Sequence, residues 1–256
     1  MSSYKIFETH AHYDDEAFDE DRDVLLGSMD ENGIQEVVNV CASIDSLEKT
    51  KALMEKYSFV YGAFGIHPDD AELVTEEVLD KVRECCGLEK AVAVGEIGLD
   101  YYWHKEAGEH ELQKKVFRQQ MEIARELHMP FMVHSREAAA DTLDLVKDCV
   151  NKGMYGGIIH CFSYGKEMAR EYLNMGLYLG IGGVVTFNNA RKVKEVVEYA
   201  PLEQIVLETD SPYLSPVPYR GKRNCSLNLP LVAEEIGRIK GISSEEVVRV
   251  TGDNAR

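Results

Sequence analysis

Metal-binding and proton-transferring side chains recur directly after short apolar runs along this chain of 256 residues. The runs are rich in β-branched and aromatic residues, and six of the eight are followed by a histidine or a carboxylate. These side chains are His10, His12, His67, Glu96, His134, His160 and Asp210. Neutral imidazoles and carboxylates are common ligands of divalent metal ions. We therefore ask which fold would bring the ends of these runs together.

Eight apolar runs alternate with longer amphipathic stretches. The runs are residues 4–7, 36–40, 59–64, 91–94, 130–133, 157–159, 177–181 and 204–207. Apolar residues recur with helical spacing between them, most clearly from Leu112 to Leu127. Gly33, Gly153 and Gly176 lie where helices are expected to stop. About 32 residues per repeat is the length of one strand, one helix and two loops. The pattern predicts a (β/α)8 TIM barrel formed by residues 1–256 as a single domain.

The competing fold is an open doubly wound sheet. No G-x-G-x-x-G follows the first run, where a dinucleotide-binding sheet would carry it. In a barrel the active site lies at the C-terminal ends of the strands. Strand alternation also places Glu8, His10 and His12 on one face. So many imidazoles and carboxylates in one cavity require a positive charge among them, which predicts bound metal.

The candidate ligands are too many for one ion. A catalytic zinc typically uses about three protein ligands and keeps one position open. We therefore expect two divalent ions per chain, with Zn, Mn and Mg all compatible with the donor types. The expected arrangement has one ion at His10, His12 and Asp210, a second at His134 and His160, and Glu96 between the two.

Composition restricts the partners. The 28 Lys and Arg residues against 45 Asp and Glu residues give a formal net charge of −17, which disfavours tight sequence-independent binding to duplex DNA. A nucleic acid held locally is still compatible. Arg220, Lys222 and Arg223 place three cations after the eighth run, as a phosphate clamp would require. The six cysteines contain no C-x-x-C pair, and no apolar run has the length of a membrane span, so we expect a cytoplasmic protein.

Seven stretches resemble the TatD-type metal-dependent hydrolases, a branch of the amidohydrolase-like barrels. They are THAH at 9–12, GIHP at 65–68, GEIGLDY at 95–101, VHSR at 133–136, HCFS at 160–163, ETDSPY at 208–213 and RGKRN at 220–224. The stretches follow the family order and span nearly the whole chain. The resemblance implies a two-metal TatD family deoxyribonuclease whose ligands are the six positions chosen above, with His67 in contact with substrate. Glu8 departs from the family, which usually has Asp there.

The expected reaction is hydrolysis of DNA, from an end or as a single strand, by a metal-bound hydroxide. Asp210 is the expected general base, and Glu96 is the second expected catalytic residue. Further expected substrate contacts are Arg136 and Tyr101, whose ring is a candidate for stacking on a base. Two alternatives stay open. One is an amide or ester hydrolase, including aminoacyl esters, on the same two-metal site, and the other is a metal-binding scaffold without catalysis.

Overall fold

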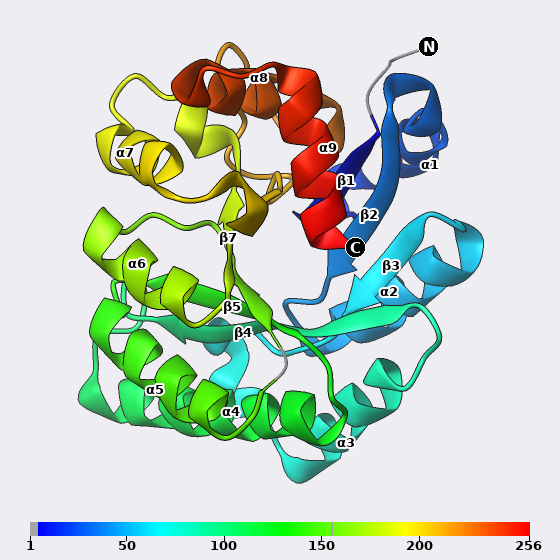
Figure 1. Ribbon diagram of the computed structural model, residues 1–256. Coiled ribbons are helices and arrows are strands. Elements are labelled where there is room, and N and C mark those ends of the chain that lie inside the picture. The colour runs from blue at the N-terminus through cyan, green and yellow to red at the C-terminus, as the bar shows by residue number, and fades with distance from the viewer. Residues whose placement is uncertain (1–4, 155) are drawn as a thin grey trace. The chain divides into compact units, whose positions relative to one another are not determined.

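The structure is a computed structural model that describes residues 5–154 and 156–256. Tyr4, with which the first predicted strand begins, lies outside the described residues. Strands and helices alternate along the chain, and the strand order runs from β1 to β8 in sequence (Figure 1). This is the topology of a (β/α)8 TIM barrel, so the predicted fold class is confirmed. That residues 1–256 form a single domain stays a prediction.

The strands lie close to the predicted runs. They are β1 (Ile6–Ala11), β2 (Ile34–Val40), β3 (Val60–Ala63), β4 (Ala91–Asp100), β5 (Phe131–Arg136), β6 (Gly157–Ile159), β7 (Tyr178–Ile181) and β8 (Ile205–Leu207). The helices are α1 (Arg22–Gly27), α2 (Ile44–Lys56), α3 (Glu76–Cys86), α4 (Ala107–Glu126), α5 (Ala139–Asn151), α6 (Lys166–Asn174), α7 (Arg191–Tyr199), α8 (Leu229–Lys240) and α9 (Ser244–Ala255).

Contacts within the chain group the residues into two units. The first contains residues up to 39, residues 161–173 and residues 178–256. In this unit β1 pairs in parallel with β2 and β7 pairs in parallel with β8. A bridge between Ala11 and Ser211 joins the end of β1 to the segment after β8. Helix α9 packs against both β1 and β8, so the unit brings the C-terminal ends of β1 and β8 together.

The second unit contains residues 40–160 and 174–177. Strands β3, β4, β5 and β6 pair in parallel in that order. Figure 1 shows α3, α4 and α5 lying along one side of β4 and β5. Strand β4 is longer than the predicted run 91–94, because it continues beside β5 as far as the pair Asp100 and Arg136. Glu96 and His134 therefore lie inside strands, whereas the sequence placed them after strand ends.

Helix α4 holds the end of β4 in place. Its buried face includes Val116 and Phe117, as the helical spacing predicts, but Leu112 and Leu127 are exposed. Two buried glutamines on this helix form hydrogen bonds with backbone groups of the same unit. Gln113 accepts a hydrogen bond from the Asp100 backbone N–H at 3.0 Å, and Gln120 in the same way contacts the segment after β3. The helix thus positions the backbone that carries Asp100.

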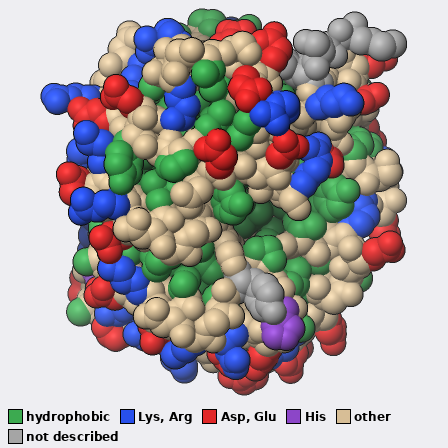
Figure 2. All heavy atoms as spheres, in the orientation of Figure 1, with side chains coloured by type: hydrophobic (Ala, Val, Ile, Leu, Met, Phe, Trp, Pro, Cys, Tyr) green, Lys and Arg blue, Asp and Glu red, His purple; other side chains and the backbone are tan. Residues whose placement is uncertain are grey.

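The predicted helix stop at Gly33 is confirmed. Gly33 ends a short helix in the left-handed conformation, with φ of 82°. Cys85 and Cys86 lie buried at the end of α3, and the cysteines of the described residues are free thiols. No helix within residues 5–154 and 156–256 is long and apolar enough to cross a membrane. On the face shown in Figure 2, acidic and basic side chains are interspersed.

Candidate metal centre

One group of metal-ligand side chains lies in the second unit around Glu96 on β4. Glu96 is 3% exposed, and its Oε1 atom lies 2.9 Å from Nδ1 of His134 on β5. The same oxygen lies 3.8 Å from Nε2 of His160, just after β6, and 4.0 Å from Nε2 of His67, which follows β3. Ligand atoms of His67, Glu96 and His134 all fall within 4.8 Å of one another. This spacing lets a single ion be held by a carboxylate and imidazoles from neighbouring strands.

His134 is held between two carboxylates. Its Nδ1 atom faces Glu96, and its Nε2 atom lies 3.2 Å from Oδ2 of Asp100 at the end of β4. Burial lowers the pKa of His134, but the hydrogen bonds to Asp100 and Glu96 outweigh it and raise that pKa to about 9. Burial likewise raises the pKa of Asp100, and its bonds to His134 and to two backbone N–H groups bring it down to about 2. A carboxylate on one nitrogen of a histidine, with the other nitrogen facing the ligand group, is a common arrangement in metal sites.

The close approach of β4 to β5 at this point requires a glycine. Gly98 lies between Glu96 and Asp100 and has φ of +149°, a conformation that side-chain-bearing residues rarely adopt. A Cβ atom at this position would lie 2.0 Å from the backbone oxygen of His134. Gly98 therefore allows the carboxylates of Glu96 and Asp100 to reach the two ring nitrogens of His134.

A second group lies in the first unit, at the ends of β1 and β8. Nε2 of His12 lies 3.4 Å from Oδ1 of Asp210, and the rings of His10 and His12 are 5.0 Å apart. The Asp210 backbone N–H donates to the carbonyl of His10 at 2.9 Å, which ties the loop after β8 to β1. Asp210 has φ of 59°, a left-handed conformation that aspartate tolerates better than most residues. The backbone from which the Asp210 carboxylate extends is thereby held beside β1.

Glu8 supports this second group through the backbone. Its Oε1 atom accepts hydrogen bonds from the backbone N–H of His10 at 3.1 Å and of Thr209 at 2.9 Å. Its Oε2 atom accepts from the Ser226 hydroxyl at 2.9 Å. Burial raises the pKa of Glu8 to about 8. Glu8 therefore holds the strand ends that carry His10 and Asp210, a backbone role that the sequence analysis did not identify.

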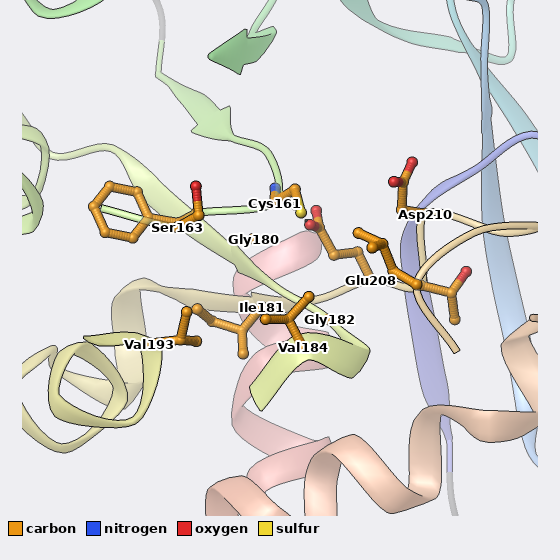
Figure 3. Close-up of a pocket in the computed structure, with 12 residues that line it drawn as sticks. Cys161, Ser163, Gly180, Ile181, Gly182, Val184, Val193, Glu208 and Asp210 are labelled. Carbon is orange, nitrogen blue, oxygen red and sulfur yellow. Dashed lines mark hydrogen bonds between the residues drawn. The ribbon is translucent and has the colours of Figure 1, made fainter. Parts of the chain in front are cut away.

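Glu208 is a further buried carboxylate beside the second group. Its Oε1 atom accepts a hydrogen bond from the Cys161 backbone N–H at 2.6 Å, and Figure 3 shows its carboxylate directed toward Cys161. A Cβ atom on Gly180 would lie 2.1 Å from Oε2 of Glu208, so glycine at this position makes room for the carboxylate. Glu208 and Asp210 both line a small pocket in this unit.

Both groups fit divalent metal ions. Each combines imidazole nitrogens with a carboxylate, and their members are buried or partly buried. Buried acidic and basic ligands that lie a few ångströms apart are the chemistry that zinc and manganese sites use, and the carboxylates also suit magnesium. The ligand set expected from the sequence thus divides into His10, His12 and Asp210 in one unit and Glu96, His134 and His160 in the other.

The residues expected to contact substrate differ in how far contacts within the protein already hold them. Arg136, the last residue of β5, is exposed, and its guanidinium carbon lies 4.0 Å from the ring centre of Tyr102. The ring of Tyr101 stacks on His110 of α4 at 3.6 Å, and its hydroxyl donates to Asp141 at 2.7 Å. Tyr101 is therefore held by intramolecular contacts because α4 and α5 flank it. His67 lies within the group around Glu96, and its contact with substrate stays a prediction.

The three cations of the predicted phosphate clamp are also not equivalent. Arg223 forms two hydrogen bonds to the carboxylate of Asp21, at 2.7 and 2.6 Å. Arg223 therefore has an acidic partner within the protein, because the chain brings the loop against the segment before α1. Arg220 stacks over Phe187 at 4.1 Å, and Lys222 lies 5.9 Å from the ring of Tyr219; both are exposed.

Asp100 has no role among the residues expected from the sequence, although one signal points to it. Glu96, Gly98 and Asp100 are spaced by two, so within an extended strand they lie on the same face. The expected run ends at residue 94, so this alternation lies beyond it.

Comparisons with known proteins give the family. The family model described as "TatD related DNase" matches residues 7–256. The uncharacterized metal-dependent hydrolase YabD of Bacillus subtilis is 39% identical, over 98% of this chain and 97% of that protein. A protein of Cronobacter sakazakii named "3'-5' ssDNA/RNA exonuclease TatD" is 30% identical, over 93% of this chain and 91% of that protein. The crystal structure of YJJV, a TatD homologue of Escherichia coli, matches with a TM-score of 0.90 at 25% identity, over 98% of this chain and 96% of that one. The chain therefore belongs to the TatD family of metal-dependent hydrolases.

Proposed function

We propose that this protein is a two-metal deoxyribonuclease that hydrolyses phosphodiester bonds at DNA ends or in single strands. The observation that carries the proposal is the imidazole of His134 between Glu96 and Asp100. A histidine held by a carboxylate on one ring nitrogen, with the other nitrogen facing a further ligand, is common in metal sites. The relative named as a single-stranded DNA and RNA exonuclease supports a nucleic acid as substrate.

The proposed ligands follow the two groups. His10, His12 and Asp210 hold one divalent ion, and His134 and His160 hold the other. Glu96 is proposed to bridge the two ions, since the C-terminal ends of all strands of a (β/α)8 barrel form one face. Zinc, manganese and magnesium are the candidate metals.

Bound divalent ions lower the pKa of water and neutralise the charge of a phosphoryl group. The chain's own residues supply the remaining functions. Asp210 is proposed to accept the proton of the attacking water, because it is partly exposed, unlike the buried Glu8 and Glu208 beside it, and the bond from its backbone N–H to the His10 carbonyl holds its backbone in place. Arg220 and Lys222 are proposed to contact the phosphates of the DNA, because both are exposed cations on the loop that follows β8.

The test is a panel of metals and substrates with the purified protein. We expect close to two ions per chain at saturation, and hydrolysis of single-stranded DNA that a chelator abolishes and added metal restores. Chelation is also expected to lower the melting temperature, because ions that bind only the folded state stabilise it. Full activity of the metal-free protein would refute the proposal. Turnover of aminoacyl or simple esters without turnover of DNA would instead support the amide and ester hydrolase alternative.

A further inference from the structure

An exposed aromatic pair follows β4 in the second unit. The side chains of Tyr102 and Trp103 are 39% and 65% exposed, and their rings meet edge to face at 4.7 Å. Single exposed aromatic residues are ordinary on protein surfaces, but here two lie together in a turn next to a candidate ligand group. The indole of Trp103 in particular presents its surface to solvent.

Two cations flank this pair. The guanidinium carbon of Arg136 lies 4.0 Å from the ring centre of Tyr102 and 5.6 Å from that of Trp103. The amine of Lys105 lies 5.3 Å from the ring centre of Tyr102. Lys105 also pairs with Glu137 at 3.4 Å, whereas within residues 5–154 and 156–256 no ion pair involves Arg136. The exposed Arg136 charge is thus available to an anionic ligand beside the indole.

The backbone under the aromatic pair is fixed by the ligand group itself. The backbone N–H groups of Tyr102 and Trp103 donate to Oδ1 of Asp100 at 2.8 and 3.1 Å. The other oxygen of the same carboxylate contacts His134. Asp100 therefore connects the turn that carries Trp103 directly to a proposed metal ligand. A turn held by two hydrogen bonds presents its side chains with little conformational freedom to lose on binding.

We propose that Trp103 and Arg136 form a nucleotide subsite, in which one base of a single-stranded nucleic acid stacks on the indole and Arg136 contacts the adjoining phosphate. This inference rests on the proposed function. A flat, exposed aromatic surface beside a cation matches a base linked to a phosphate, and such stacking accepts any base because every base has a π-face. In a chain with a net charge of −17, an unpaired arginine beside the site also offsets the repulsion of a phosphodiester.

The chain offers a direct probe of this subsite, because Trp103 is its single tryptophan. The probe is a phosphorothioate oligothymidylate, whose modified linkages slow hydrolysis, titrated into the purified protein while tryptophan fluorescence is recorded. A chain of the same length in which the bases are absent serves as the second ligand. We expect saturable quenching with the oligothymidylate and little change with the abasic chain.

Variants separate the contribution of base stacking from that of the phosphate contact. Trp103→Ala is expected to weaken binding of a labelled oligothymidylate about 5- to 150-fold by fluorescence anisotropy, and to leave binding of the abasic chain nearly unchanged. Trp103→Phe restores most of the affinity because it keeps a ring. Arg136→Gln is expected to weaken binding of both ligands. It should also reduce the salt dependence of the binding constant by about one ion. Tyr199→Ala, at an exposed aromatic residue that is 47% exposed at the end of α7, serves as the matched control and is expected to bind like the unmodified protein.

The outcomes distinguish this inference from the function on which it rests. If the unmodified protein neither binds nor hydrolyses any nucleic acid, the proposed function fails and the subsite fails with it. If the protein hydrolyses single-stranded DNA while Trp103→Ala retains the full preference for oligothymidylate over the abasic chain, the subsite is wrong and the proposed function stands.

Discussion

Replacing Asp100 by Asn tests whether the contact with His134 serves metal binding. Asp100 is 1% exposed, and its Oδ2 atom lies 3.2 Å from Nε2 of His134. Asparagine keeps an oxygen that can accept the backbone N–H groups of Tyr102 and Trp103, so the turn can retain its bonds. With that oxygen on the turn, the amide nitrogen faces Nε2 of His134 and cannot accept its hydrogen bond, so the variant removes both the negative charge and the acceptor on the far side of the imidazole.

The expected loss follows from the strength of this contact. A hydrogen bond to a charged group contributes about 1.5–3 kcal/mol. Loss of such a partner of a metal-bound histidine lowers metal affinity by about 10- to 100-fold. The two figures agree, because 1.4 kcal/mol corresponds to about tenfold. We therefore expect Asp100→Asn to bind zinc about 10- to 100-fold more weakly than the unmodified protein, with similar far-ultraviolet circular dichroism.

The measurement is competition for zinc against a chromogenic chelator. In the unmodified protein a proton on His134, whose pKa is raised to about 9, competes with the metal at neutral pH. The variant lowers this pKa, so a proton competes less with zinc in the variant near pH 7. The zinc affinity of the unmodified protein divided by that of the variant should therefore be smallest near pH 7 and grow toward pH 9. Asp141→Asn is the matched control, since Asp141 accepts a hydrogen bond from Tyr101 at 2.7 Å on the same unit. Equal zinc affinities of Asp100→Asn and the unmodified protein at pH 9, or equal losses in both variants, would refute this reasoning.

Three further predictions concern other residues. Asp210→Asn should lower kcat by about 10²–10⁴-fold and lose about one ion by elemental analysis, whereas Glu96→Gln should lose both; equal metal contents would exclude the bridging role. In denaturant unfolding, Arg223→Ala should destabilise the fold by at most about 1 kcal/mol, while Lys222→Ala should instead raise KM for DNA. Ion pairs with Arg238 and Lys194 lower the pKa of Glu235 to about 2, so their contribution is present above about pH 4.5 and is lost as the pH falls toward 2. The destabilisation by Glu235→Gln, at most about 1 kcal/mol, should therefore vanish in acid; a loss independent of pH would contradict it.

The sequence by itself determined the order of the elements and the positions of the candidate ligands along them. Hydrophobic periodicity is a local property, and helix stops such as Gly33 depend on the conformation of one residue. The starts of the eight strands could therefore be placed to within about two residues, and with them the order of His10 and His160 along the chain. The same local signals missed the extent of β4, because a strand continues as long as its neighbour offers hydrogen bonds, here as far as Arg136 of β5.

Only the tertiary structure decided which side chains contact one another. His134 has a carboxylate on each ring nitrogen because Gly98 lets two strands approach at one point. Arg223 pairs with Asp21, a residue 202 positions earlier in the chain. Such pairs depend on distances between backbone segments that are remote in sequence, and neither residue's type nor its local spacing encodes that distance. The residues able to do chemistry can thus be read from the chain, whereas their partners follow from how the strands and loops pack.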